Sequence, residues 1–245
     1  MLNPNIIKLR GTIFLPSTIG YSSANELKYK KLFPNYVVAP VVPSALQIGP
    51  SVIQLVPNGK LENGGPWQLV ERNTCIVFSP VRVDIIRDIV APFGSAESDF
   101  CAFCSKIFGS ILDEEKIEAN RLAFSPLYVK DSASDFQSQM FWSEQLKHST
   151  YCNANIEETN LTFNYRVDKK IGDQNRTVNL KTIISDAQKQ LPSGVIIKGC
   201  ITISIDINTS VNQVSPSVFS KSDIKDFFAN ASRWDIDFMN SNINE

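Results

Sequence analysis

The sequence contains little of what a catalytic or cofactor-binding site usually requires. Its 245 residues include one histidine, His148, and no G-x-S-x-G motif accompanies it. Phosphate-binding glycine loops are also missing, because the glycine pair Gly64-Gly65 lies in NGGP, outside any such motif. We therefore expect no catalytic residue and no bound cofactor.

Long apolar runs and an excess of one charge are missing too. No stretch approaches the roughly 18 apolar residues of a membrane-spanning helix, and the first residues lack the layout of a signal peptide. The 24 Lys and Arg residues balance 25 Asp and Glu residues, for a net charge of −1. This balance does not indicate nucleic acid as a partner, although it leaves room for a local basic patch. We expect a cytoplasmic protein without membrane contact.

The five cysteines raise the question of a metal site. Cys101 and Cys104 form a C-x-x-C pair, and His148 and Cys152 form a second closely spaced pair, as tetrahedral zinc would require. The competing interpretation is packing, because the first pair falls within a helical apolar pattern rich in phenylalanine. Packing is favoured, and a zinc-stabilised interaction module remains an alternative. An acidic turn before Cys101 argues against redox chemistry, because it would raise the pKa of the thiol.

The apolar patterns predict an α+β fold. Strand patterns fill the first third of the chain, and an amphipathic helix follows over about 98–112, with apolar residues three and four positions apart. The expected strands are 6–15, several short pieces within 35–55, 67–70, 75–78, 81–86, 121–129, 160–167, 178–184 and 194–207. Further helices are expected over 135–148 and from 222 onward. Clustered strands favour mostly antiparallel sheet packed by about three helices, in one domain over 1–245 or with a subdivision near 150–160.

Charged segments offer two weaker hypotheses. The triplets Glu114-Glu115-Lys116 and Asp168-Lys169-Lys170 resemble part of a metal-dependent nuclease site, which needs clustered carboxylates. Such triplets are frequent by chance, so solvated surface charge is the favoured interpretation. The basic stretch Lys28–Lys31 is likewise interpreted as a solvated amphipathic segment rather than a nucleic-acid-binding strip.

The last helix carries a large aromatic load. Phe227, Phe228, Trp234 and Phe238 recur at helical spacing. Most of these rings must cover the sheet, and Trp234 is the candidate for an interface residue that contacts a partner.

Taken in order, VIQLVP, IVFSPVRVDII, RLAFSP, ITISIDINT and SDIKDFFANASRW form a layout that resembles a sporadically distributed bacterial family of uncharacterised proteins. The resemblance covers about 45–238 and consists of apolar patterns, so no catalytic residue comes with it. It implies a component of a small multi-gene bacterial system, including anti-phage defence or toxin–antitoxin-like loci.

Together these observations favour a non-catalytic macromolecule-binding protein. A protein partner or self-association is expected, while nucleic acid is not indicated by charge. The alternatives are a metal-dependent nuclease or hydrolase that uses dispersed Asp and Glu residues, and the zinc-stabilised module.

Overall fold

The computed structural model describes residues 5–41, 46–48, 51–53, 60–89, 96–130, 160–190, 196–210 and 218–242. In this part of the chain, nine strands form one antiparallel sheet in the order β2-β5-β6-β7-β1-β8-β11-β10-β9. These strands are β1 (Asn5–Phe14), β2 (Val37–Pro40), β5 (Trp67–Glu71), β6 (Thr74–Ser79), β7 (Arg82–Asp88), β8 (Arg121–Lys130), β9 (Asn160–Ile171), β10 (Gln174–Gln190) and β11 (Ile196–Thr209). A separate hairpin consists of β3 (Leu46–Ile48) and β4 (Ser51–Ile53).

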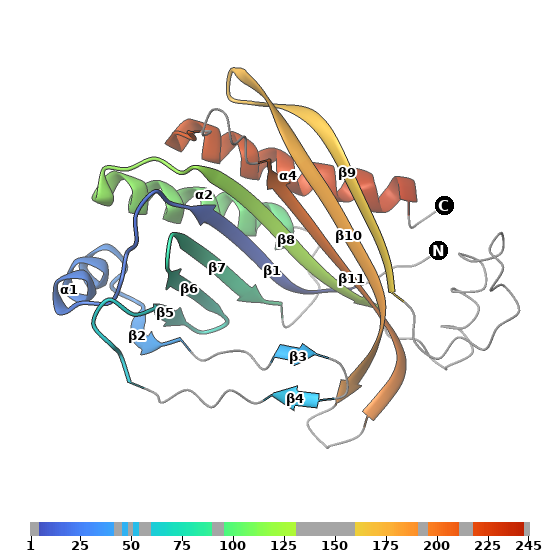
Figure 1. Ribbon diagram of the computed structural model, residues 1–245, viewed down its shortest axis with the longest axis horizontal. Helices are drawn as coiled ribbons and strands as arrows, with labels where there is room; N and C mark the ends of the chain where they lie inside the picture. The colour runs from blue at the N-terminus through green and yellow to red at the C-terminus, as the bar shows by residue number, and fades with distance from the viewer. Residues whose placement is uncertain are drawn as a thin grey trace, which may run out of the picture.

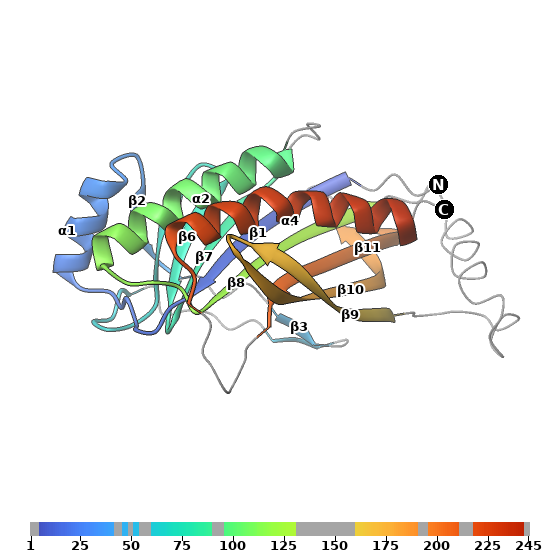
Figure 2. The same cartoon turned by 90° about the horizontal axis from the view of Figure 1, so that it is seen from above.

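Helices cover one face of this sheet. The long helices α2 (Ala96–Glu115) and α4 (Lys221–Asn242) pack against each other on the same side, and α1 (Ser23–Leu32) lies at the end of the molecule near β2 (Figures 1 and 2). The predicted α+β class with mostly antiparallel sheet is confirmed. The helix expected over 135–148 lies outside the described residues. Among the described residues, no helix has both the length and the apolarity to span a membrane.

The core lies between the sheet and the two long helices, as the alternation along the strands requires. In β1, Leu9 and Ile13 are fully buried beneath the helices, whereas Lys8 and Arg10 point to the opposite face. In β11 the residues at odd positions from Ile201 to Ile207 are all isoleucine and all buried. This one-sided burial explains why the alternating patterns located the strands well.

The strand order contains an internal duplication. From the centre outward, one half of the sheet runs β1, β7, β6, β5, and the other half runs β8, β11, β10, β9. Each half is therefore a central strand, a three-stranded meander that packs back against it, and a long helix, α2 or α4. The two central strands pair antiparallel, as a twofold axis between them requires. In the first half, α1, β2, β3 and β4 lie between the central strand and the meander, and the corresponding connection of the second half lies outside the described residues.

Two matching hydrogen bonds fix the position of this pseudo-twofold axis. Thr12 Oγ1 donates to Asp84 Oδ1 at 2.6 Å in the first half, and Ser125 Oγ donates to Asp206 Oδ1 at 3.1 Å in the second. Thr12 and Ser125 directly follow Gly11 and Phe124, which are paired with each other across the central strands. The axis thus passes through the Gly11–Phe124 pair, and α2 and α4 meet above it.

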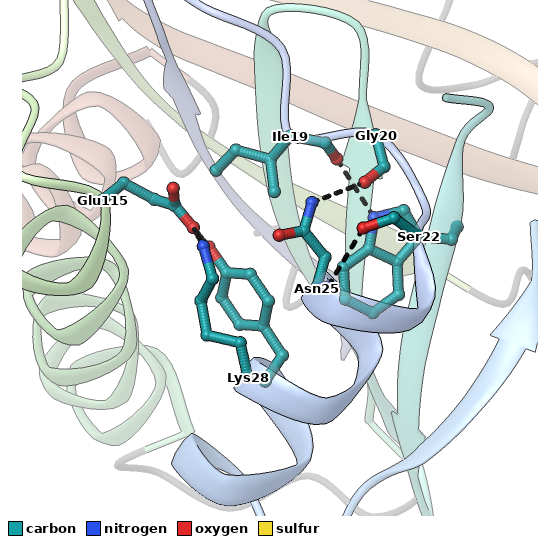
Figure 3. Close-up of polar contacts among 8 residues, drawn as sticks. Ile19, Gly20, Ser22, Asn25, Lys28 and Glu115 are labelled. Atoms are coloured by element: carbon teal, nitrogen blue, oxygen red, sulfur yellow. Dashed lines mark hydrogen bonds and ion pairs between the residues drawn. The ribbon is translucent and has the colours of Figure 1, made fainter. Parts of the chain in front are cut away.

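The helix α1 is absent from the sequence-based expectations. In the stretch interpreted as a solvated amphipathic segment, Lys30 and Lys31 are exposed, whereas Tyr29 is buried and Lys28 is partly buried. Ser22 caps the helix by accepting from Asn25 N at 3.1 Å. Tyr29 is fully buried and donates to Glu115 Oε1 at 2.7 Å, and Lys28 Nζ reaches the same oxygen at 2.8 Å (Figure 3). These contacts join α1 to the last turn of α2.

The loop before α1 is held in place as well. Trp67 Nε1 on β5 donates to the carbonyl of Ile19 at 3.0 Å, and Asn25 Nδ2 donates to the carbonyl of Gly20 at 2.8 Å (Figure 3). Trp67 also stacks on Phe78, with ring centroids 4.3 Å apart. Aromatic and polar contacts, rather than an apolar stripe, therefore fix α1.

Candidate functional site

The C-x-x-C pair lies in the core of the described structure. Cys101 and Cys104 are 1% and 0% exposed on the face of α2 that meets the sheet, and neither is in a disulfide. Burial raises the pKa of the Cys104 thiol well above its usual value, so the thiolate that a metal would need is disfavoured. His148 and Cys152 lie outside the described residues. The zinc alternative therefore stays an untested prediction, while the geometry of Cys104 fits packing.

The two carboxylates of the nuclease hypothesis belong to different elements. Glu114 is exposed near the end of α2 and lines a surface depression with Leu27 and Lys31 of α1. Asp168 is exposed on β9 and accepts a hydrogen bond from Thr177 Oγ1 at 2.9 Å. Within the described ranges, no group of three or more His, Cys, Asp or Glu residues is placed to hold a metal ion. The structure thus gives this hypothesis no assembled site there.

Trp234 is half-buried where α4 crosses β9. Its ring packs edge-on against Phe227 with centroids 6.0 Å apart, and Lys169 Nζ of β9 lies 5.5 Å from the centroid of the Trp234 ring. These contacts within the fold explain why the Trp234 side chain is half-buried. The interface role predicted for Trp234 stays a prediction.

A polar surface lies on the face of the sheet opposite α2 and α4. Polar and charged side chains occupy this face on the central strands, because they alternate with the apolar residues that contact the helices. We call it the uncovered face, because α1, α2 and α4, the helices of the described residues, lie on the other side of the sheet. Its basic residues are Lys8, Arg10, Arg82, Arg121, Arg166, Lys170 and Lys181, and its acidic residues are Asp84, Asp88, Asp168 and Asp206.

Asp84 organises one half of the uncovered face. Its carboxylate is only 1% exposed and accepts from Thr12, while Arg10 Nη2 and Arg82 Nε each lie 2.9 Å from its oxygens. The two arginine side chains remain 38% and 39% exposed. A buried carboxylate thereby fixes two guanidinium groups in position at the surface, where they can contact a partner with little further loss of side-chain entropy.

Asp206 organises the other half through a chain of amides. Asn208 Nδ2 donates to Asp206 Oδ2 at 2.8 Å. The side-chain oxygen Oδ1 of Asn208 accepts from Arg121 Nη2 at 2.8 Å and from Asn179 Nδ2 at 3.1 Å. Arg121 also lies over the ring of Phe14, with its Cζ 4.9 Å from the ring centroid. In this half a single arginine, Arg121, is therefore held through Asn208, which in turn is bound to Asp206.

Charge is distributed unevenly between the two sides of the molecule. Basic residues outnumber acidic ones on the uncovered face, whereas the chain as a whole has a net charge of −1. On the other side, α2 carries acidic residues at 97, 99 and 113–115 against the single lysine Lys106. The excess of basic residues on the uncovered face is thus balanced by an excess of acidic residues on α2. The net charge of the whole chain is near zero and does not reveal this difference between the two sides.

No protein-family model matches the chain, and no curated protein matches it significantly. The family resemblance therefore stays a prediction.

Sequence reasoning missed the uncovered face as a unit. Asp84 and Asp206 are visible as acids in strands, but only the register places each beside a hydroxyl and an arginine or an amide. The signal that points toward it is the alternation of Lys8, Arg10 and Thr12 with buried residues in β1, which assigns basic and polar side chains to one face.

Proposed function

We propose that this protein is a non-catalytic binding component of a bacterial multi-protein system, and that the uncovered face binds an acidic surface of a protein partner. The observation that supports this proposal is the pair of arginines, Arg10 and Arg82, that Asp84 holds in position on the uncovered face, with Arg121 held nearby through Asn208. Arginines that are already oriented and half-exposed suit charge-assisted hydrogen bonds to carboxylates.

The same surface favours a protein over a nucleic acid as the partner. Sheets that bind single-stranded nucleic acid stack bases on exposed aromatic rings. Phe14 is an aromatic residue of the uncovered face on the central strands, and Arg121 lies over its ring.

The test is affinity capture from a nuclease-treated lysate of the source organism, using the full chain and matched charge variants. Lys8→Glu with Lys181→Glu reverses two exposed charges of the uncovered face. Lys106→Glu with Lys225→Glu makes the same change in net charge on the exposed side of the helical layer. We expect the first variant to lose a salt-sensitive protein partner that the wild type and the second variant retain.

Two results would contradict the proposal. One is a partner that both variants retain equally, since the uncovered face would then not be the binding surface. The other is salt-sensitive capture from an untreated lysate, run in parallel, that is lost from the nuclease-treated one, which would identify nucleic acid as the ligand.

A further inference from the structure

The two edges of the nine-stranded sheet are built differently. At one edge, β2 has only four residues and ends at Pro40, and short strands and prolines are common ways to prevent unwanted strand pairing. At the other edge, β9 has 12 residues, contains no proline, and pairs with β10 without a register shift (Figure 1). One edge is thus protected against further pairing, while the other is long and regular.

The outer side of β9 is open within the described structure. Of the described strands, only β10 pairs with β9. Phe163 and Tyr165 on this strand are 36% and 42% exposed, so both aromatic rings are partly open to solvent. Alternate residues of an edge strand direct N–H and C=O groups outward, so β9 offers a row of backbone donors and acceptors.

We propose that two copies of this chain pair through β9, antiparallel, around a twofold axis at Val167. The two sheets then form one continuous sheet, and the helical layers of both copies lie on the same side. An interface of this kind is isologous, because each copy contributes the same strand. The proposal does not depend on the binding role of the uncovered face.

The charge pattern of β9 is complementary to itself in this register. Arg166 of one copy lies opposite Asp168 of the other, and the axis repeats the pair, so two ion pairs form on the uncovered face. Tyr165 lies opposite Lys169, an aromatic–cation contact, and Asn164 lies opposite Lys170. No residue of β9 meets a like charge directly across the interface.

Neighbouring registers lack this complementarity. An axis at Arg166 or at Asp168 places that residue opposite its own copy, so like charges face each other. An axis at Tyr165 brings together no opposite charges, because Arg166 then faces Asn164 and Asp168 faces Thr162. An axis that passes between two residues, for example between 166 and 167, would pair residues that belong to opposite faces of the sheet. The helical layers of the two copies would then lie on opposite sides of the joined sheet. Val167 is therefore the favoured centre.

The test is sedimentation equilibrium of the full chain and of charge variants on β9. Arg166→Asp places Asp opposite Asp168, and Asp168→Arg places Arg opposite Arg166, so each single variant replaces two attractive pairs by two repulsive ones. We expect the wild type to be a dimer, and each single variant to raise the dissociation constant about tenfold or more. Lys181→Asp, an exposed change on neighbouring β10, is the control and should leave the dimer unchanged.

Combining the changes separates specific pairing from damage to the strand. The double variant Arg166→Asp with Asp168→Arg restores opposite charges and should dimerise again. Mixing the two single variants should give a heterodimer, since the two aspartates at positions 166 and 168 of one variant then face the two arginines at these positions of the other. A monomeric wild type at high concentration, single variants that dimerise like the wild type, or failure of both rescues would each overturn the proposal.

Discussion

Replacing Gly11 by alanine tests how tightly the two helices meet the sheet at the pseudo-twofold axis. A Cβ at position 11 would lie 2.6 Å from Cys104 Sγ on α2 and 3.1 Å from Phe228 Cε1 on α4. The first distance is shorter than real contacts allow. Cys104 is fully buried, so its sulfur has no solvent to move into. The change should therefore overpack the core.

The magnitude follows from two opposing effects. Overpacking a well-packed core costs about 1–3 kcal/mol, whereas replacing glycine in a strand recovers about 0.5–1 kcal/mol of backbone entropy. We expect Gly11→Ala to destabilise the protein by about 1–2 kcal/mol. In a Cys104→Ala background the nearest α2 atom is Cβ at 3.4 Å, an ordinary contact. There Gly11→Ala should cost much less, with a coupling free energy of about 1–2 kcal/mol.

The assay is a double-mutant cycle measured by denaturant unfolding of the wild type, both single variants and the double variant, with zinc content determined for each. Cys104→Ala alone should cost about 1–2 kcal/mol for the lost sulfur and its cavity. Additive effects of the two substitutions would refute the packing argument. So would bound zinc in the wild type that Cys104→Ala removes, because Cys104 would then be a ligand.

Two further predictions concern buried ionisable groups. Asp84→Ala should destabilise the protein by about 1–3 kcal/mol in urea unfolding, because two arginines lose a nearly buried carboxylate. The matched change Asp206→Ala, at a half-exposed position, should cost less, and equal costs would contradict this account. Because the pKa of Cys104 is raised by burial, stability is full below the pKa of an unfolded thiol, about 8.5, and falls above it by at most about 1.4 kcal/mol per pH unit. Unfolding measured from pH 7 to 10 should show a shallower decline in Cys104→Ala, and an identical decline would refute the assignment.

Much of the fold was predictable because burial in this protein is one-sided. Strands such as β1 and β11 alternate between apolar residues under the helices and polar residues on the uncovered face. This period of two can be recognised in the amino-acid sequence. The helix α1 was not predictable in the same way. It depends on contacts such as Lys28 to Glu115, 87 residues apart in the chain, and on the burial of Tyr29 among aromatic rings. The residues next to α1 in the sequence do not indicate these distant contacts.

The candidate site was less predictable than the fold for a related reason. The neighbours of residues such as Asp84 and Asp206 are determined by the strand register. Sequence patterns do not specify this register between strands that long connections separate. The predicted candidates, Cys101, Cys104 and Trp234, stood out by residue type, and the structure packs all three against the core.

The regularity of the fold lies in its topology, because the two halves of the sheet repeat one arrangement of strands and helix. The repeating unit is half of the sheet with its helix, and what the halves share is topology and a hydroxyl–aspartate pair rather than extended sequence. Both α2 and α4 approach the axis at Gly11, where a Cβ would lie 2.6 Å from Cys104 Sγ and 3.1 Å from Phe228 Cε1, so glycine lets the two helices pack closely on the sheet. The two halves differ most at their outer ends. One end acquires α1 and the short strand β2, while the other leaves β9 long and regular.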